Sequence, residues 1–235
     1  MRVLGIITAR GGSKGIPRKN LAPVCGKPLI EYTIKSAQSA RKLTETIVST
    51  DDQEIAEVCM GLGVEAPFLR PEELARDTTP TLPVLQHAIT TLSERGRNFD
   101  AVCLLQPTSP QRSRDLIDRC IEQFETAGTD SLITVSKIPH AYNPMWVYWM
   151  DSAGHLALAT GGVEPIKRRQ DLPLGYVRDG RIYLTRVHTL MNDNSLFGSS
   201  VHGVELPCGI NIDTDTDLEA FRKAMLDQGS SFHAV

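Results

Sequence analysis

The sequence lacks the features of several large classes of protein. No apolar run approaches the ~18 residues of a membrane-spanning helix, and no signal-peptide pattern precedes the first strand-like segment. The 5 cysteines are widely spaced without a C-x-x-C pair, and the net charge of −3 argues against general binding to nucleic acid or a membrane surface. We therefore expect a cytoplasmic protein with neither a nucleic-acid nor a membrane partner.

Two common nucleotide-binding signatures are also missing. A Walker A loop requires Gly-Lys followed by Ser or Thr, whereas here Lys14 precedes Gly15 and Ile16. The G-x-G-x-x-G spacing of dinucleotide-binding folds is absent as well. The sequence therefore carries neither of the signatures that would indicate a kinase-like protein or a dehydrogenase.

A loop rich in glycine and cations is present instead, directly after an apolar strand at residues 3–7. Its glycines can adopt positive φ and let backbone N–H groups approach an anion closely. The loop residues in question are Gly11, Gly12 and Gly15, with the cations Arg10, Lys14, Arg18 and Lys19. In an acidic chain this local charge predicts a polyphosphate cradle. A flexible basic turn is the alternative, which the position after a strand of an open α/β sheet disfavours.

The rest of the chain predicts one α/β domain, because strand-like and helix-like segments alternate over 235 residues. Asp51 or Asp52 is placed to cap the helix that follows the second strand. Buried, chemically inert positions are expected for Cys59 and Cys103. Strands are predicted at 46–50, 64–69, 101–105, 131–135 and 180–185, and helices from Pro28 and at 82–95 and 114–124.

This alternation breaks at residues 139–175, where an aromatic segment, a Gly-containing turn and a short apolar segment predict a β-hairpin. Both tryptophans, Trp146 and Trp149, lie here. Aromatic clusters are enriched at interfaces, which favours a dimerisation arm. Packing of the arm on its own domain is the alternative.

Three polar segments are further candidates for a site. Gln106, Thr108 and Ser109 follow the strand at 101–105 and suit either ligand binding or a tight turn. A basic run at 167–169 suits an anionic substrate or a solvated face. Asp213 follows a predicted strand near Ile210 and is assigned to magnesium, whereas Asp215 and Asp217 are assigned to the start of the last helix. The polar segment at 70–81 is long enough to be functional.

With these segments assembled, the chain resembles the acylneuraminate cytidylyltransferase family, which makes CMP-sialic acid and related CMP-nonulosonates. The resemblance is nearly full length, and the CMP-KDO synthetases, with a different first loop, rank lower. The motifs that carry it are Ile7-x-Ala9-Arg10-Gly11-Gly12-Ser13-Lys14-Gly15-Ile16-Pro17-x-Lys19-Asn20-Leu21, Ser49-Thr50-Asp51-Asp52-x-Glu54-Ile55-Ala56, Leu69-Arg70-Pro71-x-Glu73-Leu74-Ala75, Leu105-Gln106-Pro107-Thr108-Ser109-Pro110-x-Arg112, Arg169-Gln170-x-Leu172-Pro173 and Asp179-Gly180-x-Ile182-Tyr183.

The resemblance implies a single domain over residues 1–235, a Rossmann-like three-layer α/β nucleotidyltransferase fold with a β-hairpin dimerisation arm at 139–175. It further implies a homodimer that uses CTP and Mg²⁺ to transfer CMP to the anomeric hydroxyl of a nonulosonic acid, releasing pyrophosphate. The roles implied are catalysis by Arg10, Lys14 and Asp213; nucleotide binding by Ala9, Arg10, Gly11, Gly12, Ser13, Lys14, Lys19, Asn20 and Arg70; substrate binding by Gln106, Thr108, Ser109, Arg169, Gln170 and Tyr183; and metal binding by Asp213 and Asn211.

Two positions depart from the family pattern. Asn211 stands where the family commonly has a second acid, which weakens the expected metal site, and Asp179 stands where an Asn is usual, which bears on the identity of the sugar. Two alternatives therefore stay open. One is a non-catalytic nucleotide-binding or regulatory relative, and the other is a nucleotidyltransferase for another sugar such as KDO or a sugar phosphate.

Overall fold

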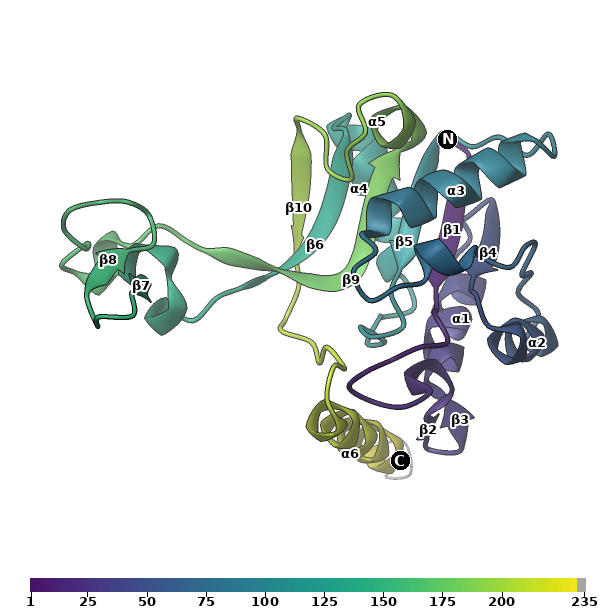
Figure 1. Ribbon diagram of the computed structural model, residues 1–235, viewed down its shortest axis with the longest axis horizontal. Coiled ribbons are helices and arrows are strands. Elements are labelled where there is room, and N and C mark those ends of the chain that lie inside the picture. Colours follow the sequence, from purple (N-terminus) through teal and green to yellow (C-terminus); the bar gives the residue numbers. More distant parts are fainter. Residues whose placement is uncertain (232–235) are drawn as a thin grey trace.

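A computed structural model of the protein, which describes residues 1–231, has a mixed six-stranded sheet at its centre (Figure 1). The strand order is β10-β6-β9-β5-β1-β4. Strand β1 pairs in parallel with β4 and β5, whereas β9 runs antiparallel between β5 and β6. The strands are β1 (Val3–Thr8), β4 (Glu45–Ser49), β5 (Ala101–Leu105), β6 (Ser131–Lys137), β9 (Tyr176–Arg186) and β10 (Val201–Glu205).

Helices cover both faces of this sheet, because its central strands carry apolar side chains on both sides. In β1, Val3 and Ile7 pack in one cluster with α1, α2 and α4, whereas Leu4 and Ile6 pack in another with α3 and α5. Complete burial of each such side chain contributes about 1.5–3 kcal/mol. The fold is therefore a three-layer α/β domain, as the sequence predicts. Its helices are α1 (Leu29–Ser39), α2 (Gln53–Gly61), α3 (Thr81–Ser93), α4 (Leu116–Ala127) and α5 (Val187–Met191).

The last helix, α6 (Asp215–Ser231), packs against the loop that follows β1. Ile16 of that loop shares a buried cluster with Ile212 and Phe221, beside the small hairpin of β2 (Pro23–Val24) and β3 (Lys27–Pro28). At the start of α6, Asp217 accepts hydrogen bonds from the backbone N–H groups of residues 213 and 214, and its own N–H bonds back to the Thr214 hydroxyl. These contacts hold the segment around Asp213 against the glycine-rich loop.

Several predicted elements are confirmed and two are wrong. Asp52 is the residue that caps α2, accepting from the N–H of Ile55 at 2.9 Å. The predicted strand at 64–69 is absent, and only Glu65 and Leu69 form isolated bridges, because Pro67 in its middle has no N–H to donate. The predicted strand before Asp213 is also absent. The edge strand that precedes this segment, β10, ends at Glu205.

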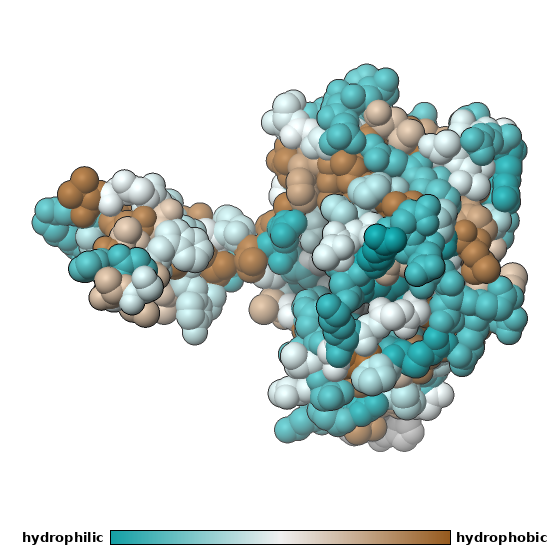
Figure 2. Space-filling view, in the orientation of Figure 1, coloured by the Kyte–Doolittle hydropathy of each residue, from teal (hydrophilic) through white to brown (hydrophobic). Residues whose placement is uncertain are grey.

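The arm at residues 139–175 projects away from the sheet and does not pack on its own domain (Figure 1). It contains the predicted antiparallel hairpin, in which β7 (Tyr148–Met150) pairs with β8 (Leu156–Leu158). Hydrophobic residues are visible on the arm and along its narrow connection to the sheet (Figure 2). Within residues 1–231, no helix is long and apolar enough to span a membrane.

Candidate active site

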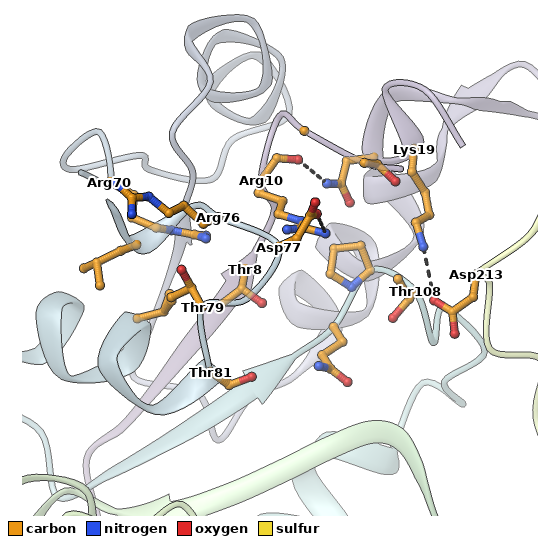
Figure 3. A pocket seen from close by; sticks show the side chains of 17 residues that line it. Thr8, Arg10, Lys19, Arg70, Arg76, Asp77, Thr79, Thr81, Thr108 and Asp213 are labelled. Atoms are coloured by element: carbon orange, nitrogen blue, oxygen red, sulfur yellow. Dashed lines mark hydrogen bonds and ion pairs between the residues drawn. The ribbon is translucent and has the colours of Figure 1, made fainter. Parts of the chain in front are cut away.

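A polar cavity of about 370 Å³ lies where β1 and β5 end. Thr8 is the last residue of β1, and Gln106 follows β5, so the cavity lies at the carboxyl edge of two parallel strands, where open α/β sheets bind ligands. Figure 3 shows its labelled side chains converging from several segments. It is lined by Thr8, Arg10, Gly12, Ser13, Lys19, Asn20, Arg70, Leu74, Arg76, Asp77, Thr79, Thr81, Val84, Gln106, Pro107, Thr108 and Asp213.

The glycine-rich loop is held in place by hydrogen bonds at both ends. The Asn20 side-chain amide donates to the Arg10 carbonyl at 2.9 Å, and the Gly11 N–H donates to Asp51 Oδ1 at 3.0 Å. The expected positive φ is not found at Gly11, Gly12 or Gly15. Two of these positions require glycine because there is no room for a side chain. A Cβ at Gly11 would overlap the Asp52 side chain, and one at Gly15 would overlap the backbone carbonyl of Asp213.

The cations of this loop do not all face the cavity. Arg10 lines it, and the exposed Lys14 lies beside it through a shared partner. Arg18 instead pairs with Asp52 and Glu54, and its guanidinium lowers the pKa of the Asp52 carboxyl. Ala9 is buried, and its N–H is already bonded to the Ser49 carbonyl at 3.0 Å.

Asp77 is the shared partner of Arg10, at 2.7 Å, and of Lys14, at 2.8 Å. Figure 3 shows Asp77 beside Arg10. The hydrogen bond from Lys14, together with both positive charges, lowers the pKa of the Asp77 carboxyl. Asp77 was missed in the sequence, although the segment at 70–81 that carries it was singled out by its length. The two cations expected to bind phosphate oxygens are thus already paired with a carboxylate of the same chain.

Arg70 also lines the cavity and is buried. Its Nε donates to Ser49 Oγ at 3.1 Å, and a second guanidinium nitrogen donates to the Ser49 carbonyl. Burial lowers the pKa of Arg70 to about 10, and the neighbouring charge of Arg10 acts in the same direction. Arg70 therefore stays charged at neutral pH and adds a fixed cation to the pocket.

A second cavity of about 230 Å³ adjoins the first and shares Gln106 with it. Arg112, which is half-buried, donates to the Gln106 carbonyl at 2.9 Å and so fixes the backbone between the two cavities. Arg112 belongs to the motif that follows β5, but that motif did not predict this role. The second cavity is lined by Gln106, Ser136, Val177, Arg178, Asp179, Gly180, Tyr183, Cys208, Gly209 and Asn211.

Asp179, one of the two departures from the family pattern, has its acceptor oxygens engaged within its own chain. It pairs with Arg181 at 2.6 Å and accepts a hydrogen bond from the Thr134 hydroxyl. Both side chains of the ion pair are about nine-tenths buried. The Asp179 carboxylate therefore stabilises β9 beside the cavity.

Two of the predicted substrate-binding residues lie far from both cavities. Arg169 and Gln170 belong to a short 3₁₀ turn in the arm, Arg169–Asp171. The neighbouring cations of the basic run form exposed pairs within the arm, Arg168 with Asp171 and Lys167 with Glu164. Ser109 lines neither cavity among the described residues, but it is buried and its hydroxyl donates to Asn211 Oδ1 at 3.1 Å.

The predicted metal ligands lie together between the two cavities. The Asp213 carboxylate is 65% exposed and lies 3.2 Å from Lys19 Nζ. Asn211 directs its amide nitrogen to the second Asp213 oxygen and its carbonyl oxygen to Ser109. One exposed carboxylate beside an amide oxygen would suit magnesium, which usually takes few protein ligands together with phosphate oxygens and water. Coordination by Asn211 requires its amide to turn over.

The mixed α/β sheet and the cation-lined pocket at its carboxyl edge are those of a nucleotidyltransferase. The chain belongs to the cytidylyltransferase family, whose model matches residues 4–199. It is 34% identical to CMP-N,N'-diacetyllegionaminic acid synthase of Legionella pneumophila over 96% of this chain and 97% of that protein. It is 32% identical to pseudaminic acid cytidylyltransferase of Campylobacter jejuni, covering 93% of this chain and 94% of the other. The resemblance inferred from the motifs is confirmed, and the protein is an enzyme of this type.

Solved structures show the same fold at low sequence identity. CMP:2-keto-3-deoxy-manno-octonic acid synthetase complexed with CTP superposes with a TM-score of 0.75 at 18% identity, covering 97% of this chain and 100% of that one. The 4-diphosphocytidyl-2C-methyl-D-erythritol synthase of Anaerococcus prevotii superposes with a TM-score of 0.65 at 15% identity, covering 96% and 98% of the two chains. The three-layer fold with its Rossmann-like core is therefore shared.

Proposed function

We propose that this enzyme transfers CMP from CTP to the anomeric hydroxyl of a nonulosonic acid and releases pyrophosphate. The observation that carries the proposal is the pair of adjoining cavities that share Gln106. The first offers cations for a triphosphate, and the second offers polar groups for a sugar acid. Relatives over nearly the full length of the chain are named for CMP transfer to legionaminic and pseudaminic acids.

For the donor, Arg10, Lys14 and Arg70 bind the phosphate oxygens, while Ser13, Lys19 and Asn20 hold the nucleotide along the glycine-rich loop. Negative charge on the phosphoryl oxygens grows as the acceptor oxygen attacks the α-phosphorus. Fixed cations stabilise that charge without a covalent enzyme intermediate. Asp77 forms ion pairs with Arg10 and Lys14. These pairs must break before both cations can bind the phosphates of CTP.

Magnesium is part of the proposal, with Asp213 as its protein carboxylate. The ion, when bound, would neutralise phosphate charge and orient the triphosphate. Lys19 and Asn211 both contact Asp213 and hold the carboxylate at the junction of the two cavities.

For the acceptor, Gln106, Thr108 and Tyr183 line the two cavities, and Ser109 positions Asn211. Arg169 and Gln170 lie on the arm, so they reach an acceptor only if the arm meets another copy of the chain. A homodimer built through the arm is therefore included in the proposal. The arm exposes large apolar side chains that a partner would cover: Tyr142, Tyr148, Trp149, Met150, Leu156, Val163 and Leu174.

We also propose a cytoplasmic location. All five cysteines are free thiols in the structure, in agreement with a reducing compartment. Cys59, Cys103 and Cys120 are buried, and burial raises the pKa of the Cys59 thiol to about 12. These core thiols have no part in the proposed chemistry.

The test is pyrophosphate release from CTP and magnesium across N-acetylneuraminate, legionaminate, pseudaminate, deaminated neuraminate and KDO, with each acid omitted as a control. Release with one nonulosonate supports the proposal and names the acceptor. Release with KDO alone would mean that the acceptor is KDO and not a nonulosonic acid. CTP binding without release at any magnesium concentration would favour a non-catalytic nucleotide-binding protein.

A further inference from the structure

The second cavity contains two polar groups whose roles are still unassigned. Ser136 lines it and is 2% exposed, yet its hydroxyl oxygen has no hydrogen-bond partner. Buried hydroxyl groups are nearly always paired, so this one is suited to bond a group that enters the cavity. Arg178 lines the same cavity from β9 and takes part in no ion pair within residues 1–231.

The neighbouring cation on β9, Arg181, does not line this cavity and is already neutralised. Arg181 is paired with Asp179 and also donates to the carbonyl of Pro207. The free positive charge of the cavity is therefore that of Arg178. An anionic group that enters from solvent meets this guanidinium without having to break an internal salt bridge.

The Arg178 guanidinium also lies over an aromatic ring. Its central carbon lies 5.8 Å from the centroid of the Phe197 ring, and Phe197 packs in turn against Tyr183 with ring centroids 6.4 Å apart. A cation–π contact engages the positive charge without a hydrogen-bond acceptor, so N–H groups of the guanidinium stay available to a ligand. Those N–H groups match the two oxygens of a carboxylate.

We infer that Arg178 binds the carboxylate of the acceptor acid, with the Ser136 hydroxyl as a second polar contact in the same cavity. This inference rests on the proposed function and assigns the substrate charge to a residue of the same chain as Gln106 and Tyr183. It differs from the expectation for Arg169, which lies on the arm. Arg178 acts as a specificity-determining residue for acids over neutral sugars.

The test compares Arg178→Gln with the wild-type enzyme on the accepted acid and on its uncharged methyl ester. We expect the KM for the acid to rise on the order of 10- to 100-fold, the range for one lost charge-assisted contact, with the Kd for CTP unchanged. The preference for acid over ester should fall by the same factor. Ser136→Ala should raise the KM for acid and ester alike, because it leaves the guanidinium in place.

Arg186→Gln is the matched control. Arg186 lies on the same strand and makes the same kind of contact, 5.2 Å from the Phe124 ring centroid, but it lines neither of the two cavities. Arg169→Gln tests the competing cation. If Arg169→Gln abolishes the acid preference and Arg178→Gln leaves it intact, the inference is overturned.

Calorimetric binding of the acid to the CTP complex without magnesium separates this inference from the proposed reaction. If Arg178-dependent binding occurs and no pyrophosphate is released with magnesium, the proposed function fails and the assignment of the carboxylate stands. If the wild-type complex binds acid and ester equally, or binds neither, the assignment is wrong.

Discussion

Replacing Asp77 by Asn should tighten the binding of CTP. The substitution keeps the size of the side chain but removes the charge that engages Arg10 at 2.7 Å and Lys14 at 2.8 Å. Both cations would then be free for phosphate oxygens before the nucleotide arrives. The carboxylate of Asp77 thus competes with CTP, and a competitor that is part of the chain is present at a fixed effective concentration.

The size of the effect follows from the exposure of the pairs. Lys14 is 83% exposed and Arg10 is 34% exposed, so solvent screens both interactions. A partly exposed ion pair changes an equilibrium by up to roughly five-fold, so two pairs predict a fall in the Kd for CTP of roughly 2- to 20-fold. Because salt screens exposed charges, the gain should shrink as ionic strength rises.

The assay is calorimetric titration of CTP without acceptor at low and high salt. Glu73→Gln is the matched control, since it removes one negative charge from the same segment without contacting Arg10 or Lys14. If Asp77→Asn weakens CTP binding, Asp77 is a direct contact of the nucleotide or its metal, and the competition argument is refuted. Equal tightening by Glu73→Gln would mean that only the net charge of the segment matters.

Three further outcomes are expected. Lys14→Ala should lower kcat/KM on the order of 10- to 100-fold with an unchanged melting temperature, and a well-folded variant with normal turnover would remove Lys14 from the site. Asp179→Ala leaves the Arg181 cation buried without its partner and should lower the unfolding free energy, measured by urea titration, by about 3–5 kcal/mol. An unfolding free energy equal to that of the wild type would mean that water replaces the carboxylate. Hydrogen bonds from Ser199 and its neighbour lower the pKa of Asp130 to about 2. The stability that this carboxylate gives the folded protein is therefore complete above the unfolded pKa near 4 and is lost as pH falls towards 2. In urea titrations across that range, the unfolding free energy of Asp130→Asn should depend less on pH than that of the wild type.

Most of the residues predicted to bind the nucleotide line the first cavity, because most of them lie in short motifs next to strands, and their roles stay predictions. Arg10, Lys19 and Asn20 lie in the loop that follows β1, and Gln106 follows β5 directly. The parallel pairing of these strands therefore brings the motifs to one edge. Asp213 joins them through the contact of the last helix with the first loop. Local motifs and the α/β pattern were sufficient for this part of the site.

The remaining features depend on contacts between distant segments. Asp77 meets Arg10 and Lys14 because the segment at 70–81 runs back to the first loop. No short motif encodes the course of that segment. β10 was missed because it is an edge strand with Gly203 at its centre and mostly exposed side chains. The opposite roles of Arg178 and Arg181, one free and one paired, appear only when Asp179 is placed beside them.

The two ends of the arm leave the sheet as neighbours. Lys137 of β6 and Tyr176 of β9 are directly paired, and the next N–H, that of Ile138, donates to the Gly175 carbonyl at 3.0 Å. A two-residue turn such as Asn-Gly joins antiparallel strands at that separation. The whole projection is thus a removable module: a shortened gene with such a turn would encode a core with both cavities, and its mass in solution would report directly on what the arm assembles.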